Sequence, residues 1–363
     1  TITGTCTATA FAGDGSALTG TGVTSDAQRN TVGGTNAGDS FTGTDALDNA
    51  LFGYNAGTAI TTGDSNTAVG ASTLDANTTG GSNTAVGMQA MGSHTTGDDN
   101  TALGHSALFA NTTASNNTAI GRFALGSNTT GATNTAVGAF ALDANTTGAD
   151  LVALGAYALT KSTTGVRNTA IGRATLEENT TESDNTAVGH YSLLSNTASN
   201  NTGIGSYALK ANTTGTYNVA LGVEALDHNT TGSSNTVVGA YALDANTTAS
   251  NNTAVGIQAL GSNTTASDNT AVGANALGTN TTGAYNTAVG YGALQLNTTA
   301  RDNAALGYKA LEANTTGTAN TGLGYQALRQ TTTGSANTAV GYTALDANTT
   351  GGNNVAVGGR ALD

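Results

Sequence analysis

The chain contains no proline, no tryptophan and only one cysteine, Cys6. A single cysteine excludes an intrachain disulfide framework, and we expect a small buried thiol, with a link between chains as the alternative. Charged residues make up 9% of the sequence, far below the roughly 25% that is usual in soluble domains. No apolar run approaches the roughly 18 residues that span a bilayer. The sequence therefore predicts no membrane insertion.

Positive charge is also scarce. The ten lysines and arginines are scattered without forming a basic run, and the formal net charge is −13. Nucleic acids and anionic membranes attract basic surfaces, so this balance argues against nucleic acid as a partner. An acidic, lysine-poor and proline-free chain suits an extracellular protein, and we expect it on the surface of a virion or a cell.

What the chain has in abundance is an internal repeat. Asn66–Gly70 (Asn-Thr-Ala-Val-Gly) returns at Asn83–Gly87 and then about every 17 residues as far as Asn354–Gly358. The unit is Asn-Thr-Ala-Val-Gly-x-x-Ala-Leu-x-x-Asn-Thr-Thr-Gly-x-x, and repeat positions below are counted from its first Asn. A period of this size predicts a solenoid, in which each unit buries its apolar face by stacking on its neighbours.

The predicted fold class is all-β, a homotrimeric parallel β-solenoid (β-roll) of about eighteen 17-residue rungs. We place the solenoid at residues 49–363, and an N-terminal strand with a Gly/Thr-rich cap or connector at residues 1–48. Thr-Ala-Val at positions 2–4 favours a strand because β-branched residues fit a pleated surface. The unvarying glycine at position 5 implies positive φ or a close backbone approach. The leucine at position 9, replaced once by Met91, implies a core slot.

The rest of the unit is harder to interpret. For positions 6–11 we expect a second short strand, with a single helical turn as the alternative. Asn-Thr-Thr at positions 12–14 predicts a turn, because the unit that starts at Asn185 has lost one residue there. Triplets such as Asn111–Thr113 predict ladders of side-chain hydrogen bonds and are also formal N-glycosylation acceptors.

Positions 3 and 4 are both apolar, although neighbouring residues of a strand point to opposite faces. One face must fill the core of the coil, and the other must contact something else. The residue at position 3 is almost always Ala or Gly, so we expect it to pack closely against a second copy of the chain. This predicts a homo-oligomer with Ala136, Ala254 and Ala271 between chains, and the narrow contact favours a trimer.

The Asn-Thr-Ala-Val-Gly unit resembles the repeats in the heads of trimeric autotransporter adhesins, which carry similar Ser/Thr-Val-Ala-Ile-Gly segments. Those heads are trimeric left-handed parallel β-rolls. The segment Phe11–Gly20 (Phe-Ala-Gly-Asp-Gly-Ser-Ala-Leu-Thr-Gly) is similar to one that recurs in phage tail fibres and related trimeric surface proteins. Both resemblances imply a trimer displayed on a surface.

The sequence gives little evidence of a catalytic site. The four histidines are spread over three repeat positions without ligand-like spacing. No nucleophile, base and orienting group can be assembled, so we predict no enzyme, no catalytic residue and no cofactor. For the acidic residues near the unit boundary, a calcium site is the weaker interpretation, and solvated carboxylates in turns are the stronger one. These are Asp98, Asp99, Asp184, Asp268 and Asp302. We therefore predict no metal site.

Aromatic residues gather at two variable positions after the glycine, where stacked rungs would place their rings in ladders. Position 6 carries Tyr291, Tyr308, Tyr325 and Tyr342, and position 7 carries Phe123, Phe140, Tyr157, Tyr191, Tyr207 and Tyr241. One interpretation is structural, because aromatic ladders stabilise sheets or fill contacts between chains. The other is a stripe that stacks on the sugars of a glycan receptor. We favour the structural interpretation.

The function that fits this sequence best is a structural fibre or adhesin whose repeat shaft serves attachment to a surface or receptor, as in a phage tail fibre or a bacterial surface adhesin. Its partners would be further copies of itself and a cell-surface glycan or receptor. One alternative is an extracellular filament subunit that polymerises end to end. Another is an ice- or surface-binding solenoid, although the repeated Thr pairs lie in the predicted turn rather than on a strand.

Overall fold

The computed structural model of the chain describes residues 24–42 and 45–363. Three features discussed above lie outside the described residues. They are the N-terminal strand, which we expect at residues 1–11, Cys6 and the segment Phe11–Gly20. Within the described ranges the chain forms short strands joined by turns, without a helix. The strands are β1 (Thr24–Ser25), β2 (Thr31–Gly33), β3 (Ala50–Phe52), β4 (Thr67–Val69), β5 (Thr84–Val86), β6 (Thr101–Leu103), β7 (Thr118–Ile120), β8 (Thr135–Val137), β9 (Val152–Leu154), β10 (Thr169–Ile171), β11 (Thr186–Val188), β12 (Thr202–Ile204), β13 (Val219–Leu221), β14 (Thr236–Val238), β15 (Thr253–Val255), β16 (Thr270–Val272), β17 (Thr287–Val289), β18 (Ala304–Leu306), β19 (Thr321–Leu323), β20 (Thr338–Val340) and β21 (Val355–Val357).

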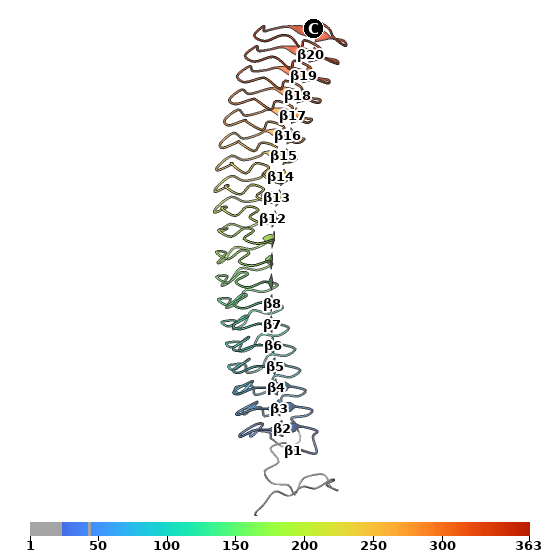
Figure 1. Cartoon of the computed structure of the whole chain (residues 1–363). Coiled ribbons are helices and arrows are strands. Elements are labelled where there is room, and N and C mark those ends of the chain that lie inside the picture. The colour runs from blue at the N-terminus through green and yellow to red at the C-terminus, as the bar shows by residue number, and fades with distance from the viewer. Residues whose placement is uncertain (1–23, 43–44) are drawn as a thin grey trace, which may run out of the picture. The chain divides into compact units, whose positions relative to one another are not determined.

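The predicted parallel β-solenoid is confirmed, with about 19 turns spaced about 17 residues apart. The chain divides into two compact units, residues 1–134 and 135–363. In the first, β1 pairs with β2 antiparallel, and β2–β7 form a parallel ladder. In the second, β8–β21 are parallel and in register, so that each residue faces its repeat equivalent (Figure 1). The ladder begins at β2, inside the segment assigned above to the cap.

The glycine at position 5 forms the corner that ends each strand. Its φ lies between 125° and 145° in every turn from Gly53 to Gly358, a region that favours glycine. Successive corners also touch, because a Cβ on Gly307 would lie 2.2 Å from the carbonyl oxygen of Gly324. Both reasons predicted for the unvarying glycine are therefore confirmed.

Positions 6–11 form a compact turn, so the expected second strand and its alternative, a helical turn, are both wrong. Positions 7 and 9 have positive φ throughout, for example 57° at Tyr241 and 50° at Leu243. Strands and right-handed helices both need negative φ, and left-handed residues reverse the chain direction. In every turn but the last, where Leu362 is exposed, the leucine side chain is buried, and this burial offsets the cost of about 1–2 kcal/mol for the conformation. The predicted core slot at position 9 is confirmed.

The alanine at position 3 lies inside the coil, which corrects the expected contact between chains. Ala136, Ala254 and Ala271 have no exposed surface in the single chain. The coil is thin, so the strand packs directly on positions 8 and 9. At Gly322, which replaces this alanine, an added Cβ would lie 3.2 Å from the Ala327 carbonyl oxygen and 3.4 Å from Leu311 Cγ. Alanine or glycine fills this space in most turns, although Val237 and Leu51 are also fully buried at position 3. The residue at position 4 points outward.

Two rows of buried asparagine side chains tie each turn to the next. The main-chain N–H of Asn100, at position 1, donates to Asn83 Oδ1 (3.0 Å), and Asn100 Nδ2 donates to the Ala114 carbonyl oxygen (2.9 Å). The Asn111 side chain, at position 12, donates to the same oxygen (3.0 Å). Since Asn111 is fully buried, the formal glycosylation triplet at this site is closed in the folded chain.

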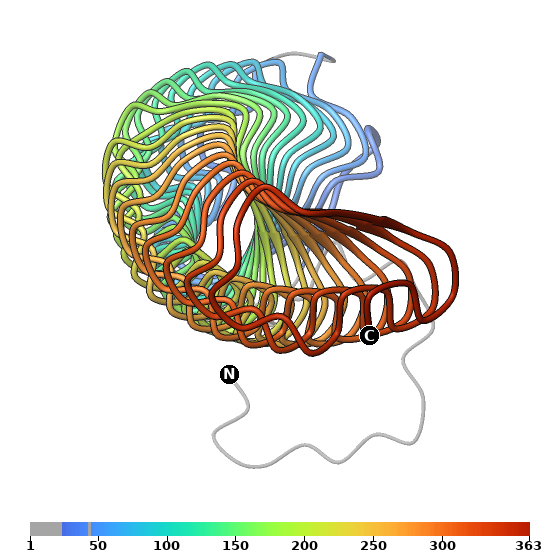
Figure 2. The ribbon, with the colours of Figure 1, turned by 90° about the horizontal axis from the view of Figure 1, so that it is seen from above.

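The Asn-Thr-Thr segment forms the predicted turn. The hydroxyl of the first threonine donates a hydrogen bond to the main-chain carbonyl oxygen of the equivalent threonine in the next turn. Thr247 Oγ1 and Thr264 O are an example (3.2 Å). The unit at Asn185 keeps this bond despite its missing residue, through Thr197 Oγ1 and Thr213 O (3.0 Å). The deletion is therefore absorbed in the turn. Seen from above, the yellow-to-red turns of the second unit rotate progressively from one to the next (Figure 2).

Candidate functional site

The four tyrosines at position 6 form a single stack. Ring centroids lie 5.5 Å apart for Tyr291 and Tyr308, and 5.2 Å apart for both Tyr308–Tyr325 and Tyr325–Tyr342. The planes are within 12° of parallel. Each residue remains between 42% and 54% exposed. The rings thus cover one another's faces and leave their edges in solvent, so a sugar cannot stack on the inner faces.

The aromatic residues at position 7 do not form one continuous stripe along the second unit, because Ala174 separates Tyr157 from Tyr191 and Glu224 separates Tyr207 from Tyr241. Phe140 and Tyr157 stack with centroids 5.4 Å apart and planes 10° from parallel, while Tyr191 and Tyr207 are tilted by 40°. In the first unit, Phe123 meets His105 edge to face, with centroids 5.5 Å apart. Tyr241 lies between Glu224 and Gln258 at the same position of adjacent turns.

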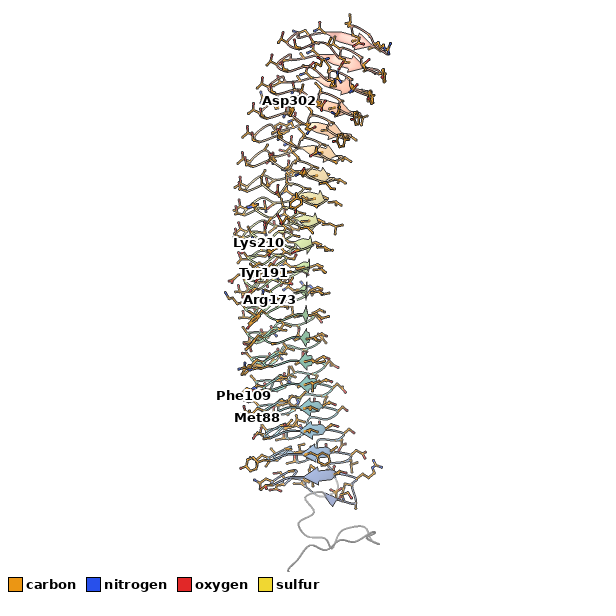
Figure 3. All side chains as sticks on the ribbon, viewed as in Figure 1. Met88, Phe109, Arg173, Tyr191, Lys210 and Asp302 are labelled. Atoms are coloured by element: carbon orange, nitrogen blue, oxygen red, sulfur yellow. The ribbon has the colours of Figure 1, made fainter. Side chains whose placement is uncertain are left out.

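Cations reinforce the tyrosine pair in the middle of the second unit. Arg173 donates to the Tyr191 hydroxyl (2.5 Å) and places its guanidinium 5.4 Å from the ring centroid. Lys210 Nζ lies 5.2 Å from the Tyr207 centroid. Figure 3 labels Arg173, Tyr191 and Lys210, which lie along the same side of the stacked turns. These contacts fit a structural ladder between adjacent turns.

Three of the acidic residues at the unit boundary, Asp98, Asp184 and Asp268, bond to neighbouring turns. Asp98 Oδ1 accepts a hydrogen bond from the Gly81 main-chain N–H (2.8 Å). Asp184 pairs with Arg167 across adjacent turns (2.7 Å), and the hydrogen bond from this guanidinium lowers the pKa of the carboxyl below its usual value. No group of three or more His, Cys, Asp or Glu side chains suited to a metal ion occurs among residues 24–42 and 45–363. The predictions that the chain has no catalytic site and binds no metal stay predictions.

The outer face of the sheet carries an aliphatic row, defined here as the residues at position 4 of the repeat. Leu154, Leu221 and Leu306 are 37%, 43% and 48% exposed, although they are large apolar side chains on a strand. A row of threonines and small residues at position 2 runs beside it. The row consists of Val69, Val86, Leu103 and Ile120 in the first unit, and Val137, Leu154, Ile171, Val188, Ile204, Leu221, Val238, Val255, Val272, Val289, Leu306, Leu323, Val340 and Val357 in the second.

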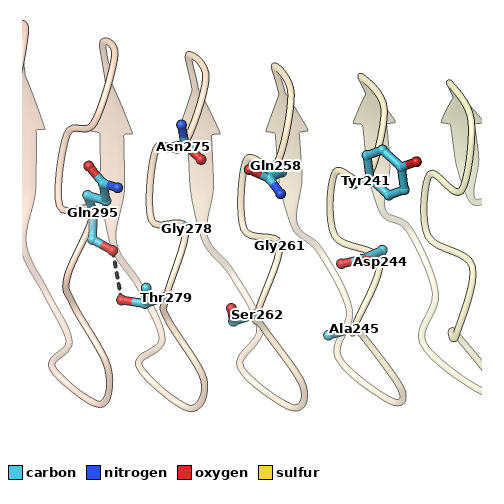
Figure 4. A pocket seen from close by; sticks show the side chains of 10 residues that line it. All are labelled: Tyr241, Asp244, Ala245, Gln258, Gly261, Ser262, Asn275, Gly278, Thr279 and Gln295. Carbon is cyan, nitrogen blue, oxygen red and sulfur yellow. Dashed lines mark hydrogen bonds between the residues drawn. The ribbon is translucent and has the colours of Figure 1, made fainter.

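A pocket of about 550 Å³ opens on the turn side of the second unit, away from the sheet face. Three rows of side chains form it over consecutive turns (Figure 4). Position 7 contributes an aromatic ring and two amide side chains. Position 10 contributes two glycines that lie between longer residues. Position 11 contributes small residues. The lining residues are Tyr241, Gln258 and Asn275, then Asp244, Gly261, Gly278 and Gln295, then Ala245, Ser262 and Thr279.

Missing side chains create this pocket. Position 10 carries residues such as Phe109, Leu194 or Lys210 in other turns, and it is glycine in two consecutive turns only at 261 and 278. Neither glycine has the positive φ that would require it, and a Cβ on Gly278 would meet its nearest atom at 3.2 Å. Sequence reasoning missed the pocket because only the fold shows that positions 7, 10 and 11 of successive turns share one surface. Consecutive glycines at position 10 were the available signal.

The charge of the pocket comes from Asp244. Its side chain is half-buried, and loss of solvent raises the pKa of the carboxyl above its usual value, with Glu224 and Asp227 contributing in the same direction. No lysine or arginine lines the pocket. Its remaining polar groups are amides and hydroxyls, of which the Thr279 hydroxyl donates to the main-chain carbonyl oxygen of Gln295 (2.7 Å).

Comparison with known proteins does not assign the chain to a family. No protein-family model matches it, and no curated protein has a similar sequence. Within the part of the chain that the structure describes, no helix is long and apolar enough to cross a membrane. The functional argument therefore depends on the aliphatic row, the aromatic stacks and the pocket.

Proposed function

We propose that the chain is the repeat shaft of a homo-oligomeric structural fibre or adhesin that serves attachment to a surface outside the cell. The observation that supports this most is the aliphatic row. Every turn from Val69 to Val357 has Val, Ile or Leu at position 4, on the outer face of the sheet. In the second unit alone, fourteen such turns follow one another, and monomeric soluble proteins rarely leave so large an apolar patch in water.

A second copy of the chain suits this face in size and chemistry. The fourteen strands β8–β21 of the second unit, about 4.8 Å apart and three residues of about 3.3 Å long, give a face of roughly 650 Å². A standard interface buries about 800 Å² on each partner, so the row and its margins reach the necessary range. No charged residue lies within these strands. Three copies packed around the row would form the trimer that the resemblance implies.

The ice-binding alternative fits this face less well. Ice presents a flat lattice with a fixed repeat, whereas the turns of the second unit rotate progressively (Figure 2). Position 4 also varies freely among Val238, Ile204 and Leu221. Such variation is typical of hydrophobic packing, in which volume and apolarity matter more than the position of each methyl group.

Charge placed in the row tests the proposed assembly. We would replace Leu154, Leu221 and Leu306 together with Lys and measure molar mass by light scattering after size exclusion. Burying three unpaired ammonium groups per chain is costly, so the variant should be a folded monomer. The wild type should run as an oligomer.

The matched control carries the same three charges on the same three turns. Thr164, Thr231 and Thr316 are exposed in the Asn-Thr-Thr turn, and their triple Lys variant should assemble like the wild type. If the row variant keeps the wild-type mass, the row is not the interface. Long assemblies that survive in the row variant would instead support end-to-end polymerisation.

A further inference from the structure

We propose that the pocket bounded by Tyr241, Asp244 and Gln295 is a binding site for a neutral oligosaccharide. The pocket lies within one chain and on a different segment from the aliphatic row, so it does not depend on assembly. A shaft could self-associate without binding sugars, so the experiment on assembly and the experiment on sugar binding can fail independently.

The size of the pocket matches a short saccharide. Its wall at position 7 runs from Tyr241 to Asn275, which are two turns apart, or roughly 10 Å, a length sufficient for about two sugar rings. Gly261 and Gly278 keep the floor between these turns clear. The volume of about 550 Å³ is within the range of small-molecule sites.

The chemistry of the lining matches the hydroxyl groups and apolar faces of a sugar. The side chains of Gln258, Asn275 and Gln295 each offer a carbonyl acceptor and an NH₂ donor, the pairing that vicinal hydroxyls need. Tyr241 is 41% exposed, and its neighbours at position 7 are Glu224 and Gln258, so no aromatic residue adjoins it there. Unlike the stacked tyrosines at position 6, Tyr241 therefore has no aromatic neighbour at its own position of the repeat.

The charge of the lining points to a neutral ligand. Asp244 contributes a carboxylate that accepts hydrogen bonds from hydroxyls and repels acidic sugars, and no basic residue of the lining compensates it. The formal charge of −13 acts in the same direction. Sialylated and sulfated glycans should therefore bind less well than their neutral counterparts.

The backbone places the polar residues at the same point of successive turns. Tyr241, Gln258 and Asn275 all have φ close to 57°, and each lies in a turn whose neighbouring leucine is buried. The Thr279 hydroxyl donates a hydrogen bond of 2.7 Å to the main-chain carbonyl oxygen of Gln295 (Figure 4). A site formed before the ligand arrives loses little conformational entropy on binding.

The test uses the full chain on an array of neutral glucose, galactose, mannose and N-acetylhexosamine oligosaccharides, printed beside sialylated and sulfated forms. Affinity for the best neutral glycan is then measured by calorimetry. Gly278→Leu should fill the pocket and weaken binding at least tenfold, because position 10 accepts Leu194 elsewhere. The control Glu177→Leu makes the same residue at position 10 of a distant turn and should bind like the wild type.

Tyr241→Ala provides a second variant that leaves the backbone turn intact, and it should also weaken binding at least tenfold while the melting temperature stays close to that of the wild type. The proposal is overturned if the wild type binds no neutral glycan on the array. It is also overturned if Gly278→Leu and Tyr241→Ala bind as well as Glu177→Leu, or if acidic glycans are preferred. Molar mass, measured on the same samples, reports separately on assembly.

Discussion

The side chain of His94 takes the place of the usual asparagine at position 12 and is fully buried. Its Nδ1 accepts a hydrogen bond from Asn111 Nδ2 (2.9 Å), and its Nε2–H donates to the Gly97 carbonyl oxygen (2.8 Å). Both nitrogens are therefore used by the neutral ring. Burial lowers the pKa of His94 below its ordinary value. A second proton would place two N–H donors against each other at Asn111.

This geometry predicts a pH dependence of stability. Because the folded state favours the neutral ring, the contribution of His94 is fully present above the unfolded pKa of about 6.5 and is lost as the pH falls below it. His94→Asn restores the repeat residue and should flatten the fall in melting temperature between about pH 6.5 and 5. Parallel melting-temperature profiles for the two proteins would contradict this.

The corner glycine allows a second test at a single residue. In Gly307→Ala the new Cβ would lie 2.2 Å from the Gly324 carbonyl oxygen, at a φ of 142°. We expect a loss of more than about 1 kcal/mol in the free energy of unfolding by urea. Gly359→Ala, whose Cβ would meet no atom within 4 Å, is the control. Equal midpoints for both variants would show that the corner is not constrained.

At the scale of the element, the sequence identified the strands but not the segment that follows them. Thr-Ala-Val marks a strand because β-branched residues favour it. Nothing marks Leu243 or Tyr241 as left-handed, since that conformation is normally carried by Gly or Asn. The prediction also assigned the two faces of the strand the wrong way round. Ala254 and Val255 are both apolar, and only the thinness of the coil decides that the smaller one points inward.

The tyrosine stack is a property of four adjacent turns. Replacing Tyr291, Tyr308, Tyr325 and Tyr342 with Ser removes three stacked pairs, each worth about 0.5–1.5 kcal/mol beyond its area burial. If the stack is structural, the thermal transition should move to lower temperature. An unchanged transition together with lost cell binding would identify the stack as a receptor surface instead.

At the scale of the whole molecule, the repeat and the solenoid were predictable because each unit repeats the same packing problem. The two surfaces that we propose for binding were not predictable. The aliphatic row emerged only once position 3 was seen to face inward, and the pocket depends on Gly261 and Gly278 lying in adjacent turns. Local departures from a repeat reveal sites only after the fold has shown which positions are neighbours.

The central claim is that the aliphatic row is covered by further copies of the same chain. Sedimentation equilibrium of the wild-type chain, over a wide range of concentrations, tests it most directly. We expect an oligomer, with three times the chain mass of 35.3 kDa if the assembly is a trimer. A folded chain that sediments at 35.3 kDa at every concentration would contradict it.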